Sequence, residues 1–171
     1  MSTSILADAF AHHAWATLRL IDACAAMPPE HLDATVPGTF GSIHATLNHL
    51  VASDSWYAFR CTNGDVQAWD DDEERRSLPE LRVSMEQQAA AWGRLLERDL
   101  DPETMTVARQ DDGAEFHAPL GIRLAQVLHH GTDHRSQVCT IMTSLGVEPP
   151  AIDVWDYGEQ AGRTREVPPP G

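Results

Sequence analysis

Apolar residues recur every three to four positions through four long segments of the chain, and this is the spacing of one face of an α-helix. Phe10, Leu18 and Ile21 mark the stripe in the first segment, and Leu81 and Met85 begin the stripe in the third. The pattern predicts four amphipathic helices. They cover about residues 4–27, 42–63, 77–100 and 121–145.

Residues at the ends of these segments support the assignment. Pro28 follows the first segment, where a missing N–H and a fixed φ end a helix. Ser77 and Glu80 have the spacing of a capping box at the start of the third. Gly146 follows the fourth, where a left-handed C-cap glycine is expected. The stretch "DVQAWDDDEERRS" between the second and third segments is expected to be a charged surface linker.

The period changes to a rough alternation before the last segment, in "TMTVARQDDGAEFHAPL". Asp112-Gly113 lies between two such stretches and indicates a β-hairpin. Four helices with one short hairpin before the last predict an all-α fold, a four-helix bundle. We expect residues 1–160 to form one domain and residues 161–171 to be a flexible C-terminal tail.

The net charge of the chain limits the classes of partner that it is expected to bind. A formal net charge of −14 disfavours phosphate backbones and anionic membrane surfaces, so we expect neither nucleic acid nor membrane as a partner. No apolar run reaches the length of about 18 residues that a membrane span needs, and the N-terminus lacks the basic region of a signal peptide. Three cysteines without a CxxC pair suggest reduced thiols in a cytoplasmic protein.

Three histidines stand out as candidate metal ligands. His130 and His134 are four residues apart on the apolar stripe of the last helix, so both rings face the core one turn from each other. His49 lies in the second helix beside small residues that permit close approach of a neighbouring helix. Three neutral imidazoles and an open position make a catalytic-type site for zinc, and nickel suits the same ligands.

A plainer interpretation is a metal-free core in which each histidine is satisfied by a backbone carbonyl. One cation, however, would serve three buried imidazoles at once. Asp54 is a candidate acceptor for a ligand imidazole or a solvated helix residue. Arg135 is expected first as an interhelical or interface salt-bridge donor, on a face that differs, like that of Gln137, from the metal face. His13 either enters the cavity or, more commonly for such a pair, belongs to a polar helix face, and His129 is expected at the surface.

Two stretches, "SIHATLNHLVASDSWYAFRCTNG" and "LHHGTDHRSQV", resemble the signature blocks of the DinB superfamily, whose members are also called DinB/YfiT-like. "HHAWATLRLID", with Trp15, is similar to the opening block of that family. Asp133 stands where the family often has His, and Ser136 where Gly is common, but neither position is a ligand. The resemblance covers residues 5–160. Its metal-site motif falls on His49, His130, His134, Arg135 and Gln137.

The resemblance implies an up-down-down-up four-helix bundle, often a homodimer, with a divalent metal on the three histidines. Some members of that family are thiol transferases or isomerases that use low-molecular-weight thiols such as bacillithiol or mycothiol. The leading hypothesis is therefore a metal-dependent thiol S-transferase acting on small electrophiles. The alternatives are a metal-dependent hydrolase, a non-catalytic bundle that binds a metal or small ligand in a stress response, and a metal-free structural bundle.

Overall fold

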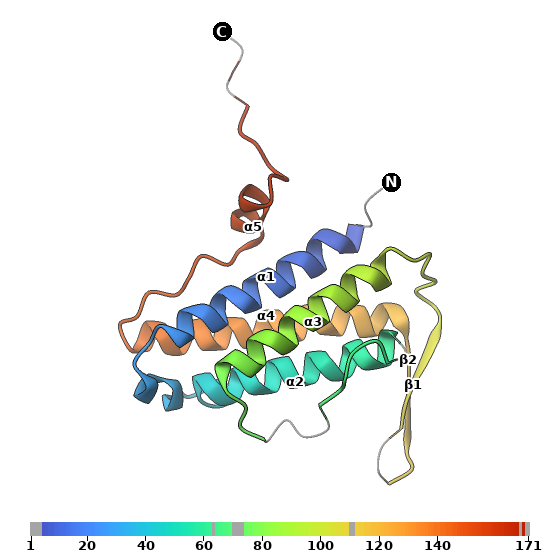
Figure 1. Ribbon diagram of the computed structural model, residues 1–171, viewed down its shortest axis with the longest axis horizontal. Helices are drawn as coiled ribbons and strands as arrows, with labels where there is room; N and C mark the ends of the chain where they lie inside the picture. Colours follow the sequence, from blue (N-terminus) through green and yellow to red (C-terminus); the bar gives the residue numbers. More distant parts are fainter. Residues whose placement is uncertain (1–4, 63, 70–73, 110–111, 168, 170–171) are drawn as a thin grey trace.

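The computed structural model describes residues 5–62, 64–69, 74–109, 112–167 and 169. Four long helices and a short antiparallel hairpin make up most of it (Figure 1). A 3-10 turn, η1, follows the first helix, and a short helix, α5, stands near the C-terminus. The elements in chain order are α1 (Ile5–Ala25), η1 (Pro29–Asp33), α2 (Ile43–Thr62), α3 (Leu78–Leu96), β1 (Met105–Arg109), β2 (Glu115–Pro119), α4 (Leu120–Ser144) and α5 (Val154–Gln160).

The four long helices pack side by side, as the sequence pattern predicts. Helix α1 contacts α3 and α4, and α2 contacts the same two helices. Leu47 and Leu81 are fully buried in one core cluster, and Phe10 and Trp92 belong to a second one. Burial of this apolar stripe, rather than helix propensity, holds such helices in place. The protein is thus mostly helical with one hairpin.

Local chemistry fixes the helix ends close to the predicted positions. The Glu80 carboxylate accepts the backbone N–H of Ser77 at 2.8 Å, which satisfies a donor that the first turn of α3 leaves open. Ser42 precedes α2, and its hydroxyl accepts the N–H of Ala45 at 3.1 Å. Gly146 follows α4 with a φ of +72°, a conformation that glycine adopts without steric cost.

The hairpin forms where the alternating stretch and Asp112-Gly113 indicate it. Strands β1 and β2 pair antiparallel, with Arg109 opposite Glu115 next to the turn and Met105 opposite Pro119 at the other end. Helix α4 begins at Leu120, directly after β2. The hairpin therefore fixes where the helix that carries two of the three histidines begins.

Two parts of the sequence-based picture need correction. The linker before α3 is not wholly a surface segment, because Trp69 is half-buried against the core and its backbone N–H bonds to Ser55 at 3.0 Å. Helix α5 was not predicted. Its start is capped by Asp153, whose carboxylate accepts two backbone N–H groups, and Tyr157 packs edge-on against Trp15 of α1. Among the described residues, none of the helices combines the length and apolarity that a membrane span needs.

Candidate metal centre

The three candidate histidines meet between α2 and α4. His130 and His134 are one turn apart on α4, and the packing of α2 against α4 brings His49 to them. Nε2 of His130 lies 3.2 Å from Nε2 of His49 and 3.1 Å from Nε2 of His134. One ring nitrogen from each residue lies within 4.8 Å of the others. The structure thus brings together all three residues that the sequence singles out.

The site favours the neutral form of His130 and His134. His134 is buried, and His49 and His130 are half-buried. Burial lowers the pKa of His130 to about 4, with smaller contributions from the positive charge that His134 and His49 would carry. Burial also lowers the pKa of His134, and the hydrogen bond that its Nδ1 donates to Gln137 acts in the opposite direction. At neutral pH these two rings therefore carry free lone pairs, and this is the form that binds a metal ion.

The spacing of the donor atoms fits a shared cation. Two nitrogen ligands at the usual Zn–N distance in a tetrahedral site stand about 3.3 Å apart, close to the two Nε2 separations in this cluster, 3.1 and 3.2 Å. Hydrogen bonding alone serves the cluster less well. Nε2 of His130 carries either one proton or one lone pair, so it can make one good hydrogen bond and leaves its other close nitrogen neighbour without one. The donor set therefore fits a divalent metal with an affinity for imidazole.

Gln137 orients one of the three rings. Its side-chain oxygen accepts the backbone N–H of Phe40 at 3.0 Å, and this contact fixes which end of the amide is the oxygen. The same oxygen lies 3.1 Å from Nδ1 of His134, so Nδ1 must donate. The lone pair of His134 is then on Nε2, which faces the other two histidines. The expectation that Gln137 faces away from the metal site is therefore wrong.

Phe40 covers the cluster from the loop before α2. Its ring stacks on His49 with 4.2 Å between centroids, and it meets His134 edge-on at 5.3 Å. Sequence reasoning missed this residue, because it lies in a Gly-rich loop outside any helical stripe. The stacking shields one side of the cluster even though 54% of the Phe40 side chain is exposed.

A network of buried polar side chains around Asp54 and His13 lies near the histidine cluster. Asp54 is 2% exposed, so it is not a solvated residue, and its carboxylate lies 3.3 Å from Nε2 of His13 and 3.4 Å from Nε1 of Trp92. The carboxylate of Asp54 thus contacts His13 and Trp92 rather than His130. Its negative charge nevertheless acts on His130, because it opposes the lowering of the His130 pKa. His13 is 1% exposed, so the polar-face interpretation of this residue is wrong.

Arg135 belongs to the same network. It is buried, and its Nη1 donates to Nδ1 of His13 at 3.0 Å and to the hydroxyl of Thr17 at 3.1 Å. It is thus an interhelical donor, as expected, but to neutral acceptors on α1 rather than to a carboxylate. His129 is exposed, as predicted.

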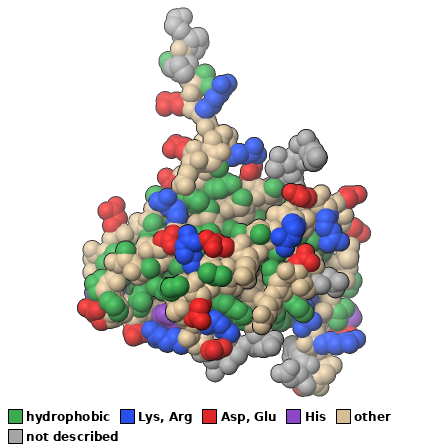
Figure 2. Space-filling view, viewed as in Figure 1, with side chains coloured by type: hydrophobic (Ala, Val, Ile, Leu, Met, Phe, Trp, Pro, Cys, Tyr) green, Lys and Arg blue, Asp and Glu red, His purple; other side chains and the backbone are tan. Residues whose placement is uncertain are grey.

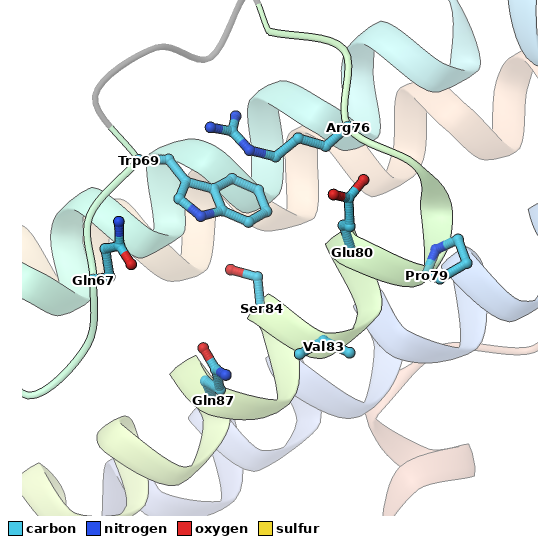
Figure 3. Close-up of a pocket in the computed structure, with 8 residues that line it drawn as sticks. All are labelled: Gln67, Trp69, Arg76, Pro79, Glu80, Val83, Ser84 and Gln87. Carbon is cyan, nitrogen blue, oxygen red and sulfur yellow. The ribbon is translucent and has the colours of Figure 1, made fainter.

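A separate hollow lies between α3 and the segment that precedes it (Figure 3). The Arg76 guanidinium lies 4.0 Å from the centre of the Trp69 ring and also pairs with Glu74 at 2.9 Å. Glu80 at the same hollow accepts from Ser77. Its two charged side chains are thus each engaged with a neighbouring residue, and none of the three histidines lines it.

A family model for the DinB family matches residues 1–167. The chain belongs to the DinB family. A crystal structure of a DinB-like protein from Bacillus cereus is similar to this DinB chain, with a TM-score of 0.61 over 83% of this chain and 91% of that chain. Sequence identity is 16%, so this likeness concerns the fold. No curated protein matches the chain.

Proposed function

We propose that this DinB protein holds one divalent cation, zinc or nickel, on His49, His130 and His134. We propose further that it works as a metal-dependent transferase, joining a low-molecular-weight thiol to a small electrophile. The observation that carries the proposal is the convergence of three imidazole nitrogens, two pairs of which are 3.1 and 3.2 Å apart. Burial favours the neutral form of two of these rings, those of His130 and His134. Three ligands leave a position for a substrate or thiol.

A cation at this position would stabilise a coordinated thiol as its thiolate, the nucleophilic form. The side chains of the protein supply the rest. Gln137 holds His134 in the tautomer that presents Nε2. Phe40 lies against His49 and excludes water from that side of the ring. Rings held in one orientation need no reorganisation when a ligand arrives, which favours both binding and reaction.

The cysteines of the chain are poor candidates for the nucleophile. Burial raises the pKa of Cys24 to about 12 and that of Cys61 to about 11, and it also raises the pKa of Cys139. At neutral pH nearly all of each thiol is therefore protonated and weakly nucleophilic. This supports the use of an external thiol, of the bacillithiol or mycothiol type.

The surface supports a small-molecule substrate. Figure 2 shows arginines separated by acidic and apolar side chains on the face in view, without the continuous basic stripe that tracks a nucleic-acid backbone. We further propose an up-down-down-up bundle that acts in the cytoplasm as a homodimer. Apolar side chains exposed at the hairpin and the start of α4 would suit a dimer contact, namely Met105, Phe116 and Ile122.

The metal assignment is tested with protein purified without a His tag. Elemental analysis after zinc or nickel loading is expected to give about one ion per chain, and His134→Ala is expected to lose it while keeping the helical circular-dichroism spectrum. The exposed neighbour substitution His129→Ala serves as the matched control and should bind normally. A ratio near zero in the wild type, or normal binding by His134→Ala, contradicts the site.

The activity is tested separately with metal-loaded protein, each candidate thiol and an electrophile such as a chlorodinitroarene or an epoxide. The proposal expects a rate that depends on both thiol and metal and is absent in His134→Ala. Metal-dependent turnover with water but not thiol indicates the hydrolase. Stoichiometric metal without turnover across the panel indicates a non-catalytic binding protein.

A further inference from the structure

A cavity of about 630 Å³ lies on the side of α4 opposite the three histidines. It is open to solvent and bounded by α1, α4 and the segment that leads into α5. Leu128, Arg135 and Cys139 line it from α4. At 100° per residue these positions point about 140–180° away from His130 and about 100–140° away from His134 around the helix axis. The cavity is therefore a different site from the metal centre.

The cavity has one polar wall and is otherwise largely apolar. Arg135 and His13, which are 4% and 1% exposed, form the polar wall. Ala9, Leu128 and Ile152 supply apolar surface. A ligand that fills this space must be mostly apolar and must present one polar group to Arg135.

Arg135 is a buried cation whose partners are all neutral. Its guanidinium donates to Nδ1 of His13, to the hydroxyl of Thr17 and, at 3.3 Å, to the hydroxyl of Thr132. Within the described parts of the chain, no carboxylate oxygen lies within ion-pair distance of it. The nearby buried carboxylate of Asp54 faces Nε2 of His13 and Nε1 of Trp92 instead. The negative charge of Asp54 acts on Arg135 from beyond His13, but among the described residues no carboxylate contacts the guanidinium directly. An anion in the cavity would form such a direct ion pair, so its binding there would be favoured.

The two acidic residues at the cavity do not compete for this role. Asp8 forms a two-point ion pair with Arg163, at 2.7 and 3.0 Å. Asp153 uses its carboxylate to cap α5. The remaining ionisable ring, His12, has its Nε2 bonded to the backbone oxygen of Ile152 at 2.9 Å. The available electrostatic partner for an incoming anion is thus Arg135.

We propose that this cavity binds a small monocarboxylate with an apolar body, its carboxylate paired with Arg135 and its body packed between α1, α4 and the segment before α5. A planar carboxylate matches the donors of a guanidinium, and the apolar surface contributes the rest of the affinity. The proposal is independent of the metal centre, because the two sites face opposite sides of α4.

The test compares hexanoate with hexanamide, which has the same apolar body but no charge. Binding is measured by calorimetry on the metal-loaded wild type, on His49→Ala and on Arg135→Gln. We expect hexanoate to bind at least tenfold more tightly than hexanamide in the first two proteins, and this preference to disappear in Arg135→Gln. Equal affinities in the wild type, or binding that is lost in His49→Ala and retained in Arg135→Gln, would overturn the proposal.

A second readout on the wild type keeps the test decisive if Arg135→Gln does not fold. Cys139 lines the cavity, whereas Cys61, which is also half-buried, does not. Saturating hexanoate should slow the alkylation of Cys139 by iodoacetamide severalfold and leave the rate at Cys61 unchanged, with each site followed by peptide mass spectrometry. An unchanged rate at Cys139 contradicts occupation of this cavity.

Discussion

The side-chain oxygen of Gln137 accepts a hydrogen bond from Nδ1 of His134 at 3.1 Å, and so determines which nitrogen of that ring faces His49 and His130. The same oxygen is held by the backbone N–H of Phe40 at 3.0 Å. A loop and a helix are thus joined through one amide group. In other metal sites, outer-sphere carboxylates and carbonyls hold a histidine ligand in one orientation and tautomer, and this amide has the same role for His134.

Gln137→Leu should weaken metal binding by about 10–100-fold, since loss of an outer-sphere partner to a histidine ligand typically costs that much. Gln137→Glu is the matched variant, because a carboxylate oxygen accepts both hydrogen bonds and should keep the affinity near that of the wild type. Competition titration of zinc against a chromophoric chelator gives the dissociation constants. Equal constants for the Leu variant and the wild type would show that the contact does not orient the ligand.

Phe40→Ala should speed metal release severalfold with little effect on folding. The ring stacks on His49 at 4.2 Å, yet more than half of it is exposed, so its removal costs little burial energy. The backbone N–H that bonds Gln137 remains. Stopped-flow transfer of zinc to a chelator measures the rate, and urea unfolding should show a change of no more than about 1 kcal/mol. Phe116→Ala, an equally exposed ring on the hairpin, should change neither the release rate nor metal affinity.

The helices and the histidine cluster were predictable because both depend on a regular period. Four-residue spacing places His130 and His134 on one helix face whatever surrounds them. The pairing of His49 with them required only that α2 and α4 be neighbours, which the family resemblance implied. The helix bounds followed from residues such as Pro28, Ser77 and Gly146, whose local chemistry acts without tertiary context.

The contacts that refine the site depend on tertiary packing and were not predictable in this way. Phe40 lies in a loop, where no period assigns an inward face. The His12-His13 pair favours a polar face for His13 without excluding the cavity, and only the position of Asp54 and Arg135 on other helices explains its burial. For Arg135, the helical period correctly places the side chain on a face other than the metal face. It does not identify His13 and Thr17 as its hydrogen-bond partners.

Gly131→Ala should destabilise the protein although alanine is the better helix former. A Cβ at Gly131 would lie 2.5 Å from Nδ1 of His13 and 2.9 Å from Nη1 of Arg135, inside contact distance of two buried groups. Overpacking of this kind costs about 1–3 kcal/mol. Gly93→Ala in α3 is the control, because nothing lies within 4 Å of a Cβ there, and it should stabilise by about 0.5–1 kcal/mol. Opposite shifts in the urea midpoint are expected, and a stabilised Gly131→Ala would show that His13 moves aside freely.

The metal-free protein should lose stability as the pH falls from 7 to 5. Burial lowers the pKa of His130 from 6.5 to about 4 in the folded protein. Between these values the unfolded chain carries a proton on this ring that the folded chain does not, so acid favours unfolding and the stability is recovered above pH 6.5. The ring is only half-buried, and after solvent screening the loss over this range is about 1–2 kcal/mol. Urea unfolding in the presence of a chelator at several pH values measures it.

His130→Gln isolates the contribution of this ring from those of the other titrating groups. The amide does not titrate, so the slope of unfolding free energy against pH between 7 and 5 should become shallower than in the wild type by about 1–2 kcal/mol over the range. His129→Gln removes a neighbouring imidazole that is exposed in the folded state, and its slope should equal that of the wild type. The comparison uses slopes because either substitution can shift the stability at pH 7 for unrelated reasons. Identical slopes in all three proteins would mean that the cluster does not hold His130 in its neutral form.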